Sequence, residues 1–251
     1  MDIGRSFTYM FEDPNWIAKL AIGGGILLAG TFLSFVLGLP LLAATALVLG
    51  YSLTVTRNVA EGSPTPLPDW NDFGTLFVKG LTAIVGVIIW ALPVILVVCC
   101  LALVNVVLGR AASSDTQGAR AASGVAAVAS ACLYCILFLL ALVVNVTVHA
   151  PLTRFALNGQ LSTFWDFGGN WRFIQANIGN YIIAVLLLLV ANLIAGLGVI
   201  ACFVGIFFTT FWANLVGAHL FGQVARGAPA STDVTPMTPL SPPPLQPAAP
   251  S

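Results

Sequence analysis

The chain alternates long apolar stretches with short segments that carry its charged side chains. Four stretches contain no Asp, Glu, Lys or Arg: residues 20–56, 80–109, 124–153 and 173–225. A helix needs about 20 residues to cross the hydrocarbon core of a bilayer, which is about 30 Å thick. The two middle stretches, at 30 residues each, therefore predict one spanning helix apiece, whereas the first and last, at 37 and 53 residues, predict two each.

This pattern predicts an all-α polytopic membrane protein built as three consecutive helical hairpins. The six transmembrane helices are expected near residues 17–37, 40–57, 80–108, 123–149, 177–197 and 203–223. Turns are expected at 38–40 and between 196 and 205, although residues 20–56 also allow a re-entrant pair of half-helices. The transmembrane domain then covers residues 1–226. The tail 227–251, with eight prolines and no aromatic residue, is expected to be disordered.

Composition and charge agree with a bilayer as the main partner. Only 7% of the residues are charged and the mean hydropathy is +0.98, too little polar surface to cover a soluble globule of 251 residues. The nine basic residues are scattered, which excludes a nucleic-acid surface. With the N-terminus inside, the outer segments carry only Arg110 and Arg120, and the cytoplasmic segments carry Arg5, Lys19, Arg57, Lys79, Arg154, Arg172 and Arg226. This asymmetry predicts that both termini are cytoplasmic.

Short acidic and aromatic segments precede the first, third and fifth predicted spans, and an arginine follows each even one. Aromatic rings favour the membrane interface, and an aspartate can cap the helix that follows it. We therefore interpret these segments as interfacial anchors and caps, with a ligand or partner surface on the cytoplasmic side as the alternative. The residues concerned are Asp13, Trp16, Arg57, Asp69, Trp70, Asp72, Phe73, Arg154, Trp165, Asp166, Phe167 and Arg226.

Several of these residues also carry a family resemblance. The segment Phe11 to Trp16, then Tyr51, the run Arg57 to Gly62 and the run Leu67 to Gly74 resemble the domain of unknown function 4013. The ending Gly217 to Gln223 is similar to that family's closing segment, so the likeness covers about residues 1–226. It implies a multi-pass protein of a bacterial or archaeal plasma membrane, and it supplies no reaction and no catalytic residue.

Polar side chains within the predicted spans are the other candidates for function. Asn145, His149, Asn192 and His219 would line a water-accessible cavity if the protein were a transporter. Both histidines lie near the predicted cytoplasmic ends of their spans, which favours a structural role. Cys132 and Cys135 have the spacing of a thiol redox pair, near the depth expected for Cys99 and Cys100, although small apolar packing is the favoured interpretation.

The sequence therefore predicts a non-enzymatic membrane protein, an assembly or envelope component without a catalytic residue, metal or cofactor. It contains no glycine-rich phosphate loop with its lysine and no nucleophile next to a base. A small-solute transporter or permease is the alternative, and a membrane thiol redox enzyme using Cys132 and Cys135 is third. Substrate, homo- or hetero-oligomeric state and protein partner stay open.

Overall fold

The computed structural model describes residues 1–112, 117–200 and 203–227, and within these residues every regular element is a helix. Their order is α1 (Ile3–Thr8), η1 (Tyr9–Glu12), α2 (Trp16–Leu37), α3 (Pro40–Glu61), α4 (Phe73–Ala112), α5 (Gln117–Thr147), α6 (His149–Asn158), η2 (Leu161–Phe164), α7 (Phe167–Ala176), α8 (Ile178–Gly196), η3 (Leu197–Ile200) and α9 (Gly205–Gly227). The predicted tail lies outside the described residues except for Gly227, the last residue of α9.

Five helical segments are long and apolar enough to cross a membrane. They are Trp16–Leu37, Pro40–Glu61, Phe73–Val106, Ala127–Asn158 and Ile178–Ile200. An all-helical chain with this many apolar helices is membrane-embedded. Helix α9 also covers most of the predicted sixth span, but it is not among the five, so the prediction of six spans is not confirmed.

The helices run beyond the predicted spans because a helix does not have to end where the membrane does. Helix α3 continues past Arg57 to Glu61 and ends at Gly62, whose φ of 86° is left-handed. Helix α4 begins at Phe73, seven residues before the predicted span, because Asp72 caps it. The turn predicted between the first two spans is present, with Gly38 at a φ of 73°.

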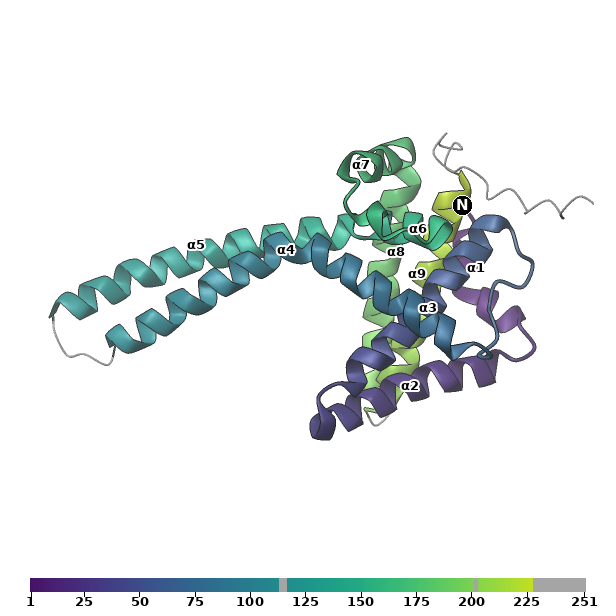
Figure 1. Cartoon of the computed structure of the whole chain (residues 1–251), viewed down its shortest axis with the longest axis horizontal. Helices are drawn as coiled ribbons and strands as arrows, with labels where there is room; N and C mark the ends of the chain where they lie inside the picture. The colour runs from purple at the N-terminus through teal and green to yellow at the C-terminus, as the bar shows by residue number, and fades with distance from the viewer. Residues whose placement is uncertain (113–116, 201–202, 228–251) are drawn as a thin grey trace, which may run out of the picture.

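Helix α9 occupies the centre of the helical assembly. Helices α1, α2, α3, α6 and α8 all pack against it, and Figure 1 shows α8 and α9 side by side with the N-terminus close to the end of α9. Every residue from Leu215 to Gly222 is buried. Because protein rather than lipid surrounds this part of α9, it can tolerate the polar and small residues that lower its hydropathy.

Small residues let the backbones of α3 and α4 approach closely. A Cβ atom added to Gly50 would collide with the carbonyl of Leu76, and one added to Gly80 would collide with the carbonyl of Ala46. Glycine at these two positions therefore sets the distance between the two helices, as small residues do in other membrane interfaces.

The buried core lies near the helix ends that carry the polar segments. Tyr51, Trp70 and Phe211 form one part, Tyr181 and Phe221 a second, and Phe155 and Phe164 a third. Away from these clusters, α4 and α5 run side by side and extend from the other helices (Figure 1), and their outer faces expose many apolar side chains. In a bilayer those faces contact lipid, so their exposure carries no solvation cost.

Candidate functional site

Three aspartates cap helices at the polar end of the protein in the same way. The carboxylate of Asp2 accepts the backbone N–H of Arg5 at 3.0 Å, Asp72 accepts that of Thr75 at 3.0 Å, and Asp166 accepts that of Gly169 at 2.8 Å. Each aspartate is followed by an apolar residue and a glycine. The sequence prediction included Asp72 and Asp166 but missed Asp2, although its Asp-Ile-Gly run carries the same signal.

Asp13 has a different role from the capping that its position before α2 suggested. The residue before α2 is Asn15, whose side chain makes no capping hydrogen bond, whereas Asp13 forms a 2.8 Å ion pair with Lys19. The Lys19 ammonium also contacts Asp69 at 3.0 Å and donates to the carbonyl of Leu67 at 3.0 Å. We call Asp13, Lys19, Leu67 and Asp69 the Lys19 cluster; it fastens the start of α2 to the segment before α4.

Burial distinguishes the two carboxylates of the Lys19 cluster. The side chains of Asp13 and Lys19 are 8% and 9% exposed, whereas that of Asp69 is 64% exposed. Burial alone would raise the pKa of Asp13, but hydrogen bonds from Lys19 and from the Asn15 backbone, with the lysine charge, hold that pKa below its ordinary value. Lys19 was absent from the predicted site because its position in the sequence does not indicate which acids it meets.

Trp70, which was predicted to anchor the chain at the membrane interface, is buried in protein. Its ring stacks on Tyr51 with centroids 4.3 Å apart, and its indole N–H donates to the Lys19 carbonyl at 3.3 Å. The Tyr51 hydroxyl donates to the Pro68 carbonyl at 2.8 Å. These contacts shield the Trp70 ring, so this residue is only 8% exposed, whereas Trp165 is 56% exposed.

The remaining predicted aromatic residues of this end are more open. Phe73 and Phe167 are exposed, and Trp16 is half-buried with its ring edge-on to Phe11. Phe167 stacks on Trp90 with centroids 4.9 Å apart. These positions are compatible with contact to a membrane interface.

The three arginines that end the even spans bind different partners. Arg154 bonds the carboxylate of Asp166 and the amide oxygen of Asn170, each at 2.8 Å. Arg57 pairs with Glu61 at 2.7 Å, and Arg226 donates to the carbonyl of Val59. The repeated sequence pattern therefore reflects similar helix ends rather than one repeated contact.

Asp166 combines capping with ion pairing. The N–H of Gly169 and the guanidinium of Arg154 together hold the pKa of Asp166 below its ordinary value. Arg154 is also positioned by Asn170, which is 1% exposed and donates to the Thr163 carbonyl at 2.8 Å. This network fixes the start of α7 on the end of α6.

His219 is held in a polar contact between α9 and α1. Its Nδ1 lies 2.9 Å from the amide nitrogen of Gln223 and 3.0 Å from the Ser6 hydroxyl, and its ring stacks on Tyr9 with centroids 4.3 Å apart. The Gln223 amide is oriented because its oxygen accepts the backbone N–H of Asp2. Its nitrogen lies within hydrogen-bond distance of Nδ1, of the Asp2 carbonyl and of the Ser6 hydroxyl, and it donates to Nδ1 in the tautomer that carries the ring proton on Nε2.

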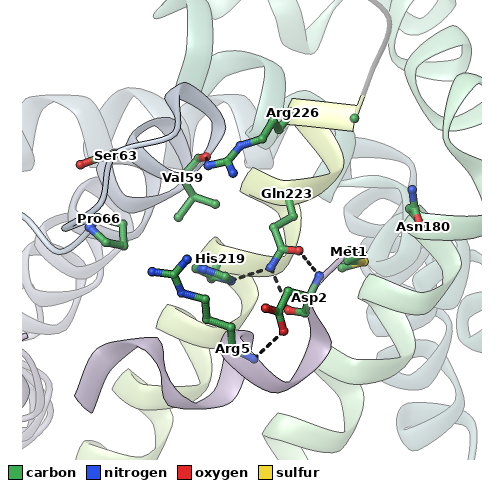
Figure 2. Close-up of a pocket in the computed structure, with 11 residues that line it drawn as sticks. Met1, Asp2, Arg5, Val59, Ser63, Pro66, Asn180, His219, Gln223 and Arg226 are labelled. Atoms are coloured by element: carbon green, nitrogen blue, oxygen red, sulfur yellow. Dashed lines mark hydrogen bonds between the residues drawn. The ribbon is translucent and has the colours of Figure 1, made fainter. Parts of the chain in front are cut away.

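A cavity of about 430 Å³ opens beside this contact. Arg5 from α1, the end of α3, and His219, Gln223 and Arg226 from α9 line it, and Figure 2 shows the His219 ring between Arg5 and Gln223. We call this space the α1–α9 cavity. It brings together two predicted candidates, His219 and Arg226, with Arg5, which sequence reasoning used only as a topology signal.

The four polar candidates within the predicted spans do not line one described cavity. His149 lies in a second cavity of about 140 Å³ with Ser52, Thr56 and Asn214. Asn145 and Asn192 are exposed and line neither cavity, and the Asn192 amide donates to the Leu188 carbonyl of its own helix. The four side chains that were expected to line one transport cavity therefore lie in separate parts of the structure.

The cysteines of α4 and α5 are free thiols on exposed surfaces. This holds for Cys99, Cys100, Cys132 and Cys135, whereas Cys202 lies outside the described residues. Among the residues that the structure describes, no group of three or more His, Cys, Asp or Glu side chains could hold a metal ion. The redox hypothesis stays a prediction, which alkylation with and without reductant would test.

The fold and the polar helix ends define a membrane-embedded helical protein. The chain belongs to the family described as "Protein of unknown function (DUF4013)", which matches residues 18–204 and confirms the predicted resemblance. Neither a curated protein nor a solved structure matches the chain. Arg5, His219, Gln223 and Arg226 lie outside the matched residues, so the α1–α9 cavity is largely built by segments that flank the match.

Proposed function

We propose that the protein is a non-enzymatic, multi-pass component of a prokaryotic plasma membrane that acts in membrane assembly or the envelope. The observation that carries this proposal is the use of polar groups at one end of the helices. The Lys19 cluster, the Arg154–Asp166 pair and the Ser6–His219 contact all join different elements or loops. Charges used this way hold a scaffold in one arrangement.

Six crossings of the membrane are supported by the position of the two ends of the described chain. The backbone of Asp2 exchanges hydrogen bonds with the Gln223 side chain at 2.6 and 3.0 Å. Two ends in contact lie on the same side of a bilayer, which requires an even number of crossings. Helix α9, about 34 Å long at 23 residues, is long enough to be the sixth.

The six crossings form three hairpins: α2 with α3, α4 with α5, and α8 with α9. Each pair is in contact. Helices α2 and α3 have 22 residues each, about 33 Å, which supports two full spans over a re-entrant pair.

Both termini are cytoplasmic in this proposal. The cations Arg5, Lys19, Arg57, Arg154 and Arg226 belong to the helix ends near the polar segments, as the positive-inside rule requires. A cysteine-free variant given one cysteine at position 113 or at 232 tests the orientation. A membrane-impermeant maleimide should label Ser113→Cys in intact cells and Thr232→Cys only after lysis; labelling at 232 in intact cells would contradict the orientation.

The assembly role is tested by deleting the gene and measuring envelope integrity and solute uptake in the same strain. We expect increased sensitivity to detergent and entry of a hydrophobic dye, both restored by the wild-type chain. A deletion strain with an intact envelope that has lost uptake of one solute would contradict the assembly role and favour transport.

A transporter is the second candidate because of the cavity around His149. Ser52 lines this cavity, and its hydroxyl is buried without a hydrogen-bond partner among the described residues. A polar group left unsatisfied is costly, and a permeating solute could satisfy it. In the cysteine-free background, Ser52→Cys should react with a small water-soluble reagent from both sides if this is a pathway. Reaction from one side only, or from neither, would contradict transport through it.

A further inference from the structure

The α1–α9 cavity gathers cationic and hydrogen-bond donating groups from two ends of the chain. Arg5 lies on the first helix, Arg226 in the last turn of α9, and His219 two turns earlier on α9. Figure 2 shows the Arg5 guanidinium beside the His219 ring and the Arg226 guanidinium beside Val59, and both side chains line the same cavity. Neither arginine is adjacent to the other in sequence, so only the packing of α1 on α9 creates this arrangement.

The local acids leave the cavity with a surplus of positive charge. Asp2 is the only acid among the lining residues, and one oxygen of its carboxylate accepts the N–H that caps α1. Arg5 pairs with Glu12 at 3.0 Å, but both side chains are about half exposed, so water weakens this pair. Arg226 donates to the Val59 carbonyl, which holds the guanidinium in place and leaves most of its five N–H groups for another acceptor.

We propose that the α1–α9 cavity binds a phosphate ester through Arg5, Arg226 and the Nε2–H of His219. Guanidinium groups match the oxygens of a phosphate in pairs, and three donor groups suit its terminal oxygens better than the two oxygens of a carboxylate. In the tautomer in which Nδ1 accepts from Gln223, His219 carries a proton on Nε2 that it can donate to the phosphate. The proposal concerns ligand binding and does not depend on the assembly role.

The size and position of the cavity indicate what carries the phosphate. A volume of about 430 Å³ falls within the range of small-molecule sites and leaves room for an ester substituent. The helix ends that form the cavity belong near the membrane boundary, where phospholipid headgroups are concentrated. A phospholipid headgroup and a soluble phosphate ester share the chemistry recognised here, and they can be separated by experiment.

The test uses the full chain purified in dodecyl maltoside. Binding of glycerol 1-phosphate is measured by calorimetry, and retention of phosphatidylglycerol against phosphatidylcholine by native mass spectrometry. We expect Arg5→Gln and Arg226→Gln each to weaken binding about tenfold or more, as loss of a charge-assisted hydrogen bond implies. Arg57→Gln is the matched control, because Arg57 is an exposed arginine paired with Glu61 and does not line the cavity.

A second pair of variants keeps both arginines. Ser63 lines the cavity and is half-buried, so Ser63→Asp adds a carboxylate there, whereas Ser63→Asn has nearly the same shape without charge. Ser63→Asp should weaken binding and Ser63→Asn should not, a comparison that remains valid if an arginine variant fails to fold.

The results separate the two sources and can overturn the proposal. Glycerol 1-phosphate binding that the cavity variants weaken supports a soluble ester. Selective retention of phosphatidylglycerol alone, reduced by the same variants, supports a lipid headgroup. If the wild-type chain binds neither probe more tightly than the cavity variants, or if Arg57→Gln weakens binding equally, the proposal is wrong.

Discussion

The Lys19 cluster offers a direct comparison of a buried and an exposed carboxylate on one cation. Asp13 and Asp69 contact the Lys19 ammonium at 2.8 and 3.0 Å, so their distances are nearly equal. Their side chains are 8% and 64% exposed. If distance alone determined the stabilisation, Asp13→Asn and Asp69→Asn would cost the same. If burial determines it, Asp13→Asn should cost far more.

The expected difference can be worked from the environment of each pair. Removing one partner of a buried ion pair costs about 3–5 kcal/mol, because the remaining charge stays buried. Asp69 and the Leu67 carbonyl still contact Lys19 after Asp13→Asn, so we expect the lower end, about 3 kcal/mol. Asp69→Asn removes an exposed partner and should cost less than about 1 kcal/mol.

Unfolding in mixed micelles of dodecyl maltoside and sodium dodecyl sulfate measures this difference. Circular dichroism follows the helices. Tryptophan fluorescence gives a second signal, to which Trp70, whose indole is bonded to the Lys19 carbonyl, contributes together with the other five tryptophans. The double variant Asp13→Leu/Lys19→Met replaces the pair with apolar groups and should be closer to wild type than Asp13→Asn. Equal shifts for Asp13→Asn and Asp69→Asn would refute the burial argument.

Three further outcomes follow from the structure. Because the pKa of Asp13 is lowered in the folded protein, its contribution is complete above the unfolded pKa, about 3.9, and is lost as the pH falls through the folded value. Unfolding titrations from pH 6 to about 2 should show a larger loss of stability in wild type than in Asp13→Asn, in which Asp166 still titrates; equal losses would contradict the role of Asp13. Gly80→Ala should lower the free energy of unfolding by about 1–3 kcal/mol or more, because the added Cβ would collide with the Ala46 carbonyl. Gly25→Ala is the control, because a Cβ at that position meets no other atom, and it should be neutral or slightly stabilising in the same assay. Equal effects of the two variants would contradict the close crossing of α3 and α4. Asp166→Ala should lower the free energy of unfolding by about 1 kcal/mol and speed hydrogen exchange of the backbone amides at the start of α7. Asp166→Asn retains an oxygen that can cap the helix, so these amides should exchange more slowly than in Asp166→Ala. Identical exchange rates in the two variants would exclude the cap.

Local patterns in the sequence predicted the parts of this protein that depend on neighbours along the chain. A helix covers every predicted span, since a charge-free stretch of about 20 residues is recognisable without knowledge of its partners. Asp72 and Asp166 accept the capping N–H bonds because a cap is made by residues three positions apart. The exact helix ends could not be predicted from these patterns: α3 continues past Arg57 to Glu61 and is stopped by the left-handed backbone of Gly62.

Contacts between distant segments were not predictable in the same way. Trp70 looked like an interfacial anchor, yet it is buried against Tyr51, and nothing in its neighbouring residues records that stack. Asp13 looked like a cap, yet it pairs with Lys19 six residues later, inside the next helix. Asn145 and His149, four residues apart on the predicted span, were expected in one cavity, but Asn145 is exposed and His149 faces another element.

Hydropathy, caps and motifs are properties of short stretches, so the amino-acid sequence was enough to predict a helical, membrane-embedded protein capped by aspartates and to indicate its family. The burial of α9 at the centre, and the cavity that Arg5 and Arg226 share beside His219, became visible only in the folded chain. Side chains more than 200 residues apart meet only through helix packing. That packing depends on the combined shape of many small residues and not on any one motif.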